Sequence, residues 1–423
     1  MQNEDHEWVL SVSFAAHDGS ITLLKDGKVE LFIKEEKASR TKHDSRFPFR
    51  CLQLIKEYTQ SLDKLLVANC PHLAPESGDD RDYLKLTKFH VDKLLMQGFV
   101  LDNSKTEYCE QHHLLHAACG FYTSGFDEAI CLVCDGWGTT AGLVYDLDNY
   151  CGIDVPPIQA SESMSIYHAS FPANFVELDK TAIYDSHRCD GLHELQKFHA
   201  RSGNNQLPSV KDFLSSIKNT ETTSHMGIGV MYGVVSASLG FDNIDCGKTM
   251  GLSAYGEEDD SIPPFFIGDT LKSNKNFFTQ SRTLDFENYN AEDIISSEEK
   301  RANLAYKMQK SLEKIYEHKI KFIDDNYECK NIVLSGGCAL NVVNNAALVE
   351  KFPHMNFFVD PVPNDAGQSL GHALLWNYEN GPCAVDNVEQ EFKIESYDNL
   401  FLGPIYSKEE LRDRINSKIL EDV

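Results

Sequence analysis

The chain is 423 residues long, which allows two or three lobes with separate cores, and its 42% hydrophobic and 25% charged residues are typical of a globular protein. Its formal net charge of −26 does not favour nucleic-acid binding over the whole surface, although a local basic patch at residues 37–50 could still hold phosphates. Because the sequence has no apolar run of about 20 residues and no secretory signal at its start, we predict a cytoplasmic protein without a membrane-spanning segment, whose cysteines are reduced.

The first predicted unit is a meander of three strands at residues 8–33. Its order is strand, Asp-Gly turn, strand, Asp-Gly turn, strand, and the turns are Asp18-Gly19 and Asp26-Gly27. Apolar side chains alternate along the third strand, which predicts one buried face made by Val29, Leu31 and Ile33.

The segment at residues 110–117 predicts a helix with a metal-binding face. Residues four apart lie about 40° apart around a helix axis, so His112 and His116 share a face. Neutral imidazoles at that spacing can bind one metal ion and leave room for carboxylates and water. His113 and His116 form a competing pair, and histidines bonded to their neighbours on a polar face are the structural alternative.

A second unit with the same strand order is predicted at residues 128–155. Asp135-Gly136 supplies its first turn, and Asp146 to Asn149 supply its second. Two such units predict a duplicated α/β fold in which helices follow each meander. This is the layout of the actin-like (ASKHA) ATPase superfamily, whose two lobes face each other across a nucleotide cleft.

The rest of the chain gives one irregular segment and two helices. Residues 152–224 have polar runs and no clear period, which predicts an inserted segment or a long helical excursion from the second lobe. Later, apolar residues at steps of three and four predict a helix with one side made by Leu304, Met308, Leu312, Ile315, Lys319 and Phe322. The apolar strand after it ends in Ser335-Gly336-Gly337 and runs into another helix.

Two aspartates and three glycine-containing turns mark the ends of predicted strands. Asp135 and Asp365 each end an apolar run, where ligands bind in open α/β sheets, although such residues also favour ordinary turns. With the two histidines they indicate a mononuclear metal site with oxygen and nitrogen ligands. The turns at 17–20, 135–140 and 335–337 could cradle phosphates, and the third precedes a predicted helix N-terminus. None matches a Walker loop or a dinucleotide fingerprint.

Seven motifs in order resemble the O-carbamoyltransferases of antibiotic tailoring and nodulation-factor synthesis. They are HDGS at 17–20, SRTKHD at 39–44, EQHHLLHAA at 110–118, DGWG at 135–138, CGKTMGLSAYG at 246–256, LSGGCALN at 334–341 and PNDAGQSLG at 363–371. A more distant likeness is to the core protein that installs threonylcarbamoyl on tRNA, which has the actin-like fold and the HxxxH metal pair.

The resemblance implies an enzyme that works in two steps. Carbamoyl phosphate and ATP would give carbamoyl adenylate in a C-terminal YrdC-like domain, and the actin-like domain would transfer the carbamoyl group to a hydroxylated acceptor. The resemblance implies an iron ion (Fe²⁺), with zinc as the alternative, bound by His112, His116, Asp135 and Asp365. ATP-derived adenylate is expected at the matching turns, with contacts from Asp18, Gly19, Ser20, Gly136, Gly138, Ser335, Gly336, Gly337, Asn341 and Asn364.

The resemblance also places His17 and Lys42 beside the reacting carbamoyl group. His17 fits a general base for the acceptor hydroxyl, because the unperturbed pKa of histidine lies near working pH. Lys42 would stabilise developing negative charge.

The expected domains are an actin-like transfer domain at residues 1–383 and, at 384–423, a linker with the start of a truncated YrdC-like domain. That second domain would act in cis or in trans. The competing functions are threonylcarbamoyl-type transfer to a nucleoside and nucleotide binding by an actin-like regulatory protein. The sequence does not identify the acceptor alcohol, and it leaves homodimer formation open.

Overall fold

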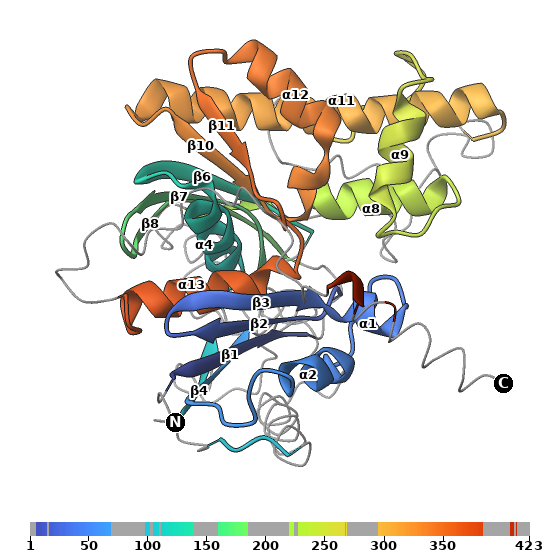
Figure 1. The fold of residues 1–423 in the computed structure, drawn as a ribbon. Coiled ribbons are helices and arrows are strands. Elements are labelled where there is room, and N and C mark those ends of the chain that lie inside the picture. The colour runs from blue at the N-terminus through green and yellow to red at the C-terminus, as the bar shows by residue number, and fades with distance from the viewer. Residues whose placement is uncertain are drawn as a thin grey trace, which may run out of the picture.

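The computed structural model describes two α/β lobes, each built on one mixed sheet (Figure 1). The described residues are 6–14, 17–68, 98–101, 105–109, 111–136, 138, 160–184, 220–223, 227–266, 268, 295–383, 407–409 and 412. The predicted linker and second-domain start at 384–423 therefore lie almost wholly outside the described residues.

The first lobe contains a five-stranded sheet in the order β3-β2-β1-β4-β5. Its strands are β1 (Trp8–Ser13), β2 (Ser20–Lys25), β3 (Lys28–Lys34), β4 (Lys64–Ala68) and β5 (Thr106–Cys109). The first three strands pair antiparallel, and β4 and β5 continue the sheet parallel to β1. The meander predicted at residues 8–33 is confirmed.

One detail of that meander differs from the prediction. Leu23 pairs with Leu31 but Leu24 pairs with Val29, so the ladder shifts by one residue between them. This β-bulge turns Val29 toward the opposite face of the sheet from Leu31. The prediction that Val29, Leu31 and Ile33 form one buried face is therefore wrong for Val29, which packs with Leu24 against α13 (Gly367–Glu379).

The second lobe contains a six-stranded sheet in the order β11-β10-β6-β7-β8-β9. Its strands are β6 (Glu128–Cys134), β7 (Ala160–Ser170), β8 (Asn174–Tyr184), β9 (Thr220–Thr223), β10 (Asn331–Ser335) and β11 (Asn356–Val359). β6, β7 and β8 pair antiparallel, whereas β10 and β11 run parallel to β6. The series β8-β7-β6-β10-β11 thus repeats the order and directions of β3-β2-β1-β4-β5, which confirms the duplicated actin-like fold.

The strands that complete the second meander lie later in the sequence than predicted. The second strand of this meander is β7, which pairs with β6, and the third is β8, which pairs with β7; the turn that joins β7 to β8 lies at residues 171–173 instead of 146–149. The prediction of an insertion or helical excursion at 152–224 is therefore wrong for 160–184, which is core sheet. Both faces of β7 are buried, since Ser163 and Ser165 are as fully buried as Met164 and Ile166, and the polar residues on one face made this segment read as surface.

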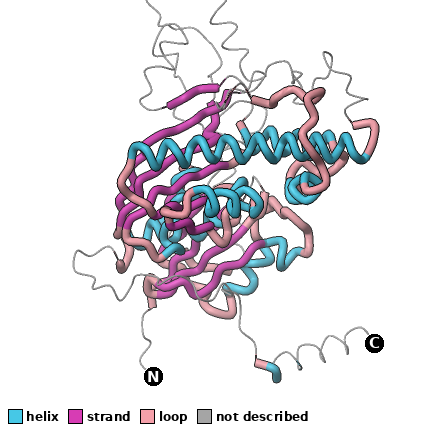
Figure 2. Tube along the Cα trace, turned by 90° about the horizontal axis from the view of Figure 1, so that it is seen from above, coloured by secondary structure: helices cyan, strands magenta, loops and turns pink. Residues whose placement is uncertain are grey.

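Two helices lie between the sheets, and others cover their outer faces (Figures 1 and 2). Helix α13 packs on β1, β2 and β4 of the first lobe, and α4 (His112–Ser124) packs on β6, β7 and β10 of the second. The remaining described helices are α1 (Glu35–Ser39), α2 (Phe49–Ile55), α8 (Ile228–Ser238), α9 (Cys246–Ser253), α11 (Glu298–Asn326), η4 (Gly337–Leu340) and α12 (Val342–Lys351). Within the described ranges, no helix combines the length and apolar character needed to cross a bilayer.

Helix α11 confirms most of the predicted apolar side. Leu304, Met308, Leu312 and Ile315 are buried in the core of the second lobe. Lys319, the one polar member of that side, is nearly buried and forms an ion pair with Asp179 of β8, with Nζ 2.7 Å from Oδ2. Phe322 is 37% exposed, and the prediction is wrong for this residue: the buried side of the helix continues instead through Ile320 and Ile323, which are both fully buried.

Helices α4 and α13 approach each other closely at Gly371. A Cβ atom on Gly371 would lie 2.0 Å from the carbonyl oxygen of Leu115, so alanine there must push the helices apart. We expect Gly371→Ala to lower the free energy of unfolding by about 1–3 kcal/mol, the usual cost of overpacking, measured by urea denaturation. The matched control is Gly251→Ala in α9, where a Cβ would have no atom of the described residues within 4 Å; it should be neutral or stabilising by up to about 1 kcal/mol. Equal stability of both variants would contradict this packing.

Candidate metal centre

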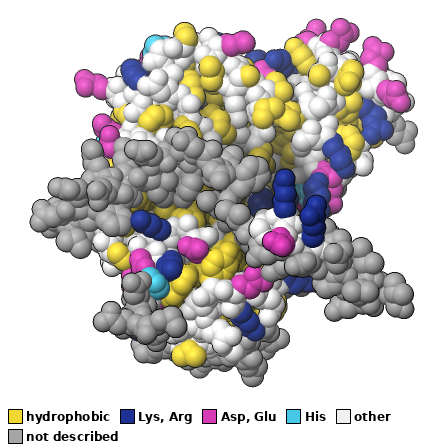
Figure 3. Space-filling view, in the orientation of Figure 1, with side chains coloured by type: hydrophobic (Ala, Val, Ile, Leu, Met, Phe, Trp, Pro, Cys, Tyr) yellow, Lys and Arg dark blue, Asp and Glu magenta, His cyan; other side chains and the backbone are white. Residues whose placement is uncertain are grey.

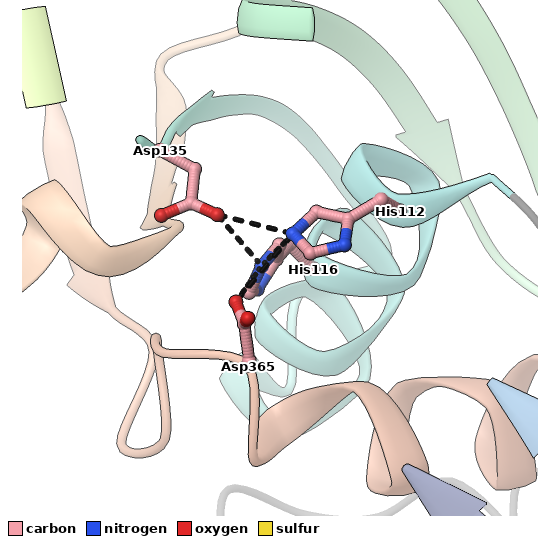
Figure 4. A group of neighbouring side chains, drawn as sticks. All are labelled: His112, His116, Asp135 and Asp365. Atoms are coloured by element: carbon pink, nitrogen blue, oxygen red, sulfur yellow. Dashed lines mark hydrogen bonds and ion pairs between the residues drawn. The ribbon is translucent and has the colours of Figure 1, made fainter. Parts of the chain in front are cut away.

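Four buried side chains from distant parts of the chain converge between the lobes (Figure 4). His112 and His116 come from successive turns of α4, Asp135 follows the last residue of β6, and Asp365 lies in the turn before α13. The Nε2 atom of His112 is 3.0 Å from Oδ2 of Asp135 and 3.5 Å from Oδ1 of Asp365. The Nε2 atom of His116 is 3.5 Å from Asp365 Oδ1 and 3.6 Å from Asp135 Oδ2.

The spacing of these atoms fits a single metal ion. Atoms that bind one ion at about 2.1 Å lie roughly 3.0–3.4 Å apart in octahedral or tetrahedral sets. The two Nε2 atoms are 3.2 Å apart, within that range. The distances from these nitrogens to the carboxylate oxygens, 3.0–3.6 Å, lie within the range or slightly above it. Oδ1 of Asp365 is buried and accepts no hydrogen bond from the described residues, so an electropositive partner would satisfy it. Two nitrogen and two oxygen donors suit iron or zinc.

The carboxylates of this group are held in their charged form. Burial opposes charge on Asp135, but hydrogen bonds with His112 and His116 outweigh it and keep the pKa of Asp135 well below 3.8. Burial likewise opposes charge on Asp365, and the charges of His17 and His112 lower its pKa below the usual range. The backbone N–H of Gly337 also donates to Oδ1 of Asp135 at 3.1 Å. Metal ligands must be deprotonated, so this environment favours binding of a cation.

The structure separates the two competing histidine pairs. His113 faces β7, where its Nδ1 lies 2.7 Å from the hydroxyl of Ser165. Burial lowers the pKa of His113 to about 3, which keeps its ring neutral. The side chains grouped with the two aspartates are those of His112 and His116, as helix geometry at positions i and i+4 favours.

Two bracing interactions were not predicted from the sequence. The Nε2 atom of Gln368, in α13, lies 2.7 Å from Nδ1 and 3.0 Å from Nε2 of His112. The hydroxyl of Ser335 lies 2.7 Å from the buried carboxylate of Asp360 and 3.0 Å from the backbone carbonyl of His116. Gln368 falls within a motif used for the resemblance, but an isolated glutamine in a helix carries no signal for this role.

His17 lies beside the metal-site aspartate. Its Nε2 atom is 3.7 Å from Oδ2 of Asp365, and its Nδ1 atom is 2.9 Å from Oδ2 of Asp18. The charge of Asp365 is the main cause that raises the pKa of His17 to about 10, against the opposing effect of burial. A cation held by Asp365 would counter that charge, so the neutral, basic form of His17 is favoured only when the site is filled.

Lys42 does not contact the metal group in this structure. Its largely exposed ammonium pairs with Asp245, the residue before α9, and Lys248 pairs with the same carboxylate at 2.6 Å. Figure 3 shows Lys and Arg side chains gathered on this face between α1 and α9. Lys42 therefore joins the first lobe to the second by an exposed ion pair, and a role at the carbamoyl group requires it to leave Asp245.

Several residues predicted to contact nucleotide are engaged within the protein. The side chains of Ser20 and Ser335 are fully buried. The hydroxyl of Ser20 donates to the backbone carbonyl of Ala366, and the hydroxyl of Ser335 donates to the carboxylate of Asp360. Both hydroxyl groups therefore have partners within the protein, and contact of these two residues with a nucleotide stays a prediction. The backbone N–H of Gly19 donates to the carbonyl of Asp44 at 2.7 Å, so it is not a free phosphate donor.

The other residues predicted to contact nucleotide differ in their hydrogen-bond partners and in how closely neighbouring atoms pack around them. Asn341 caps α12 by accepting from the N–H of Asn344, and its amide exchanges two hydrogen bonds with Gln309. Gly336, Gly337 and Gly138 are packed against Cys134, Asp135 and Glu162, respectively, so a Cβ on any of them would clash. Gly136 has no described atom within 4 Å of a Cβ position, so among the described residues it is the least crowded glycine of the set. Asp18 and Asn364 bond to each other, since the side-chain amide nitrogen of Asn364 donates to Oδ2 of Asp18 at 2.9 Å.

Comparison with known proteins supports the resemblance found in the sequence. A family model described as carbamoyltransferase N-terminus matches residues 79–374. The nodulation protein NolNO of Sinorhizobium fredii is 24% identical over 407 residues, covering 89% of this chain and 48% of that protein. The uncharacterized protein sll1178 of Synechocystis is 22% identical over 459 residues, covering 98% of this chain and 63% of that protein. The chain thus spans less than two thirds of the length of either relative.

Solved structures with a similar arrangement include HypF of T. kodakarensis. The similarity covers 90% of this chain and 48% of that one, with 16% sequence identity and a TM-score of 0.46. A second is component A of the (R)-2-hydroxyglutaryl-CoA dehydratase of Acidaminococcus fermentans, with 12% identity, coverage of 87% and 96%, and a TM-score of 0.41.

Proposed function

Because the chain belongs to the carbamoyltransferase N-terminus family, we propose that it transfers a carbamoyl group from carbamoyl adenylate to a hydroxyl group of an acceptor. The observation that carries this proposal is the buried group of His112, His116, Asp135 and Asp365 with His17 beside it. The proposed transfer domain is residues 1–383, and the donor would be made from carbamoyl phosphate and ATP by a YrdC-like domain in cis or in trans.

The reaction needs catalytic assistance with the nucleophile, with the electrophile and with the charge that develops in the transition state. An alcohol is a weak nucleophile, a carbamoyl carbonyl is a weak electrophile because of resonance, and negative charge develops on oxygen. A divalent metal on the four ligands, for which we propose iron with zinc as the alternative, supplies Lewis-acid chemistry. His17 takes the proton of the acceptor hydroxyl at Nε2, the ring atom that faces Asp365. Lys42, once released from Asp245, stabilises the developing charge.

The proposed adenylate position follows from the turn residues that remain accessible. Gly136 directly follows the metal-site aspartate, and no atom of the described residues lies within 4 Å of its Cβ position. Gly337 lies on the other side of that aspartate, to which its N–H donates. The adenylate would therefore lie next to Asp135, on the side of Gly136.

The test of this function uses the metal-loaded chain with carbamoyl adenylate labelled with carbon-13 in the carbamoyl group. A panel of hydroxylated metabolites and nucleosides serves as acceptors, and mass spectrometry detects labelled carbamate esters. We expect acceptor-dependent release of AMP and one labelled product. The variant Asp135→Asn should retain less than about a hundredth of that activity, because loss of Lewis-acid assistance costs several kcal/mol. Absence of labelled product with every acceptor, at full metal loading, would contradict the proposed transfer.

A further inference from the structure

Asp18 is a buried carboxylate surrounded by donor groups. It is 2% exposed, and its Oδ2 atom is 2.9 Å from Nδ1 of His17 and 2.9 Å from the amide nitrogen of Asn364. Nδ1 of His43 lies 3.2 Å from both carboxylate oxygens, and Nζ of Lys34 lies 3.9 Å from Oδ1. One buried charge is thus shared by two imidazoles, an amide and an ammonium.

These contacts connect the two lobes at the metal group. Asp18 lies between β1 and β2 of the first lobe, whereas Asn364 directly precedes the metal-site residue Asp365. The hydroxyl of Ser13, at the end of β1, also reaches the backbone carbonyl of Asp365 at 3.4 Å. Asp18 therefore bonds to His17 and also to Asn364, the residue before Asp365. Asp365 in turn faces His17.

We propose that Asp18 is the positioning residue of the transfer site, which holds His17 through Nδ1 so that Nε2 faces Asp365 and the acceptor hydroxyl. This proposal rests on the proposed carbamoyl transfer. With Nδ1–H donated to Asp18, the lone pair of Nε2 points to the reaction site. As the acceptor oxygen bonds to the carbamoyl carbon, its O–H bond breaks, a new N–H bond forms at Nε2, and AMP leaves with the electron pair of the cleaved bond. Asp18 stabilises the resulting imidazolium without taking the proton.

A second metal ion is the alternative occupant of this region. Asp18, Glu36 and His43 each offer a ligand atom, and these atoms lie within 4.8 Å of one another. However, Asp18 already receives the donors described above, and Nζ of Lys37 lies 3.0 Å from Glu36. A cation would have to displace those hydrogen bonds and sit beside two ammonium groups, which its charge disfavours. The geometry is that of an anchoring carboxylate.

Asparagine is the informative replacement at Asp18. The backbone of Asp18 has φ of +59°, in the left-handed region, which asparagine adopts more readily than most residues. Asparagine has the same shape but only one acceptor oxygen, so it cannot accept from His17, His43 and Asn364 together. The matched control is Asp26→Asn, because Asp26 also has a positive φ, of +50°, and also bonds to a histidine Nδ1, that of His6 at 2.7 Å.

The experiment measures two quantities on the zinc-loaded chain. Proton–nitrogen NMR follows the Nδ1–H signal of His17, assigned with a His17→Gln variant, and a coupled assay follows AMP release from carbamoyl adenylate with glycerol as the hydroxyl probe. In Asp18→Asn we expect the His17 Nδ1–H signal to move upfield or disappear and AMP release to fall by about 100-fold or more. Zinc content should stay unchanged, and Asp26→Asn should change neither the His17 signal nor AMP release.

Two outcomes would overturn the positioning role. One is an unchanged His17 signal with unchanged AMP release in Asp18→Asn. The other is loss of zinc and of folded protein with an unchanged His17 signal in the folded fraction, which indicates a structural carboxylate only. If the unaltered chain itself releases no AMP, the proposed transfer fails, and the NMR signal still decides whether Asp18 orients His17.

Discussion

Replacing His116 with alanine is expected to abolish stable metal binding by this chain. The side chain is fully buried, and its Nε2 atom lies within 3.6 Å of both metal-site carboxylates. Changing a residue that merely supports a metal ligand already lowers affinity by about 10–100-fold, so removing a ligand should cost more than about 100-fold. Alanine also leaves two buried carboxylates with one imidazole, which favours their protonation over cation binding.

Elemental analysis after dialysis against a weak chelator measures this effect. The unaltered chain should retain one divalent ion, and anaerobic purification should show whether iron or zinc occupies the site. The matched control is His113→Gln, which changes the neighbouring histidine that faces Ser165 and not the carboxylates. Metal loss in the control with retention in His116→Ala would mean that the wrong histidine has been assigned.

The local part of the metal group could be predicted from the sequence because it follows from element geometry. Residues i and i+4 share a helix face wherever the helix lies, so His112 and His116 could be proposed as a pair without a tertiary structure, although helix geometry left the pair of His113 and His116 open. Asp135 ends an apolar strand, and such positions face the ligand side of an open sheet. In both cases a short stretch of sequence determines the direction of the side chain.

The surroundings of the site could not be predicted in the same way. Gln368 meets His112 across 256 residues of sequence, and Asn364 meets Asp18 across 346. These contacts depend on how α13 packs against both lobes, which the sequence alone does not specify. The turn at 335–337 is a related case. It was predicted as a phosphate cradle, but the N–H of Gly337 donates to Asp135, because the strands β10 and β6 are adjacent.

The same limit applies to the second meander. Asp-Gly turns and apolar alternation identified the first one correctly, because its strands follow each other closely. In the second lobe, 25 residues separate the end of β6 from the start of β7, and the buried serines of β7 are not the apolar residues that mark a core strand. The duplication of the fold could be predicted because both units begin with an apolar strand that ends near an Asp-Gly pair. Which later residues complete the second unit could be determined only from the strand pairing in the structure.

The second large effect is expected from His17→Gln, which should lower carbamoyl transfer by about 100- to 10,000-fold. Glutamine retains an amide that can donate to Asp18, but it has no ring nitrogen to take the proton of the acceptor hydroxyl. His17 is not among the four grouped ligands, so the metal content of the variant should equal that of the unaltered chain. The loss should therefore appear in turnover and not in metal binding, which separates this variant from His116→Ala.

The pH dependence of turnover provides the more specific test of His17. In the metal-loaded chain a protonated His17 cannot act as a base, so activity should fall as pH drops below its pKa, and the residual activity of His17→Gln should lack this acid limb. His6→Gln is the control, because His6 bonds to Asp26 on the surface and has no contact with the metal group. If His17→Gln keeps both the wild-type rate and the acid limb, another group removes the acceptor proton.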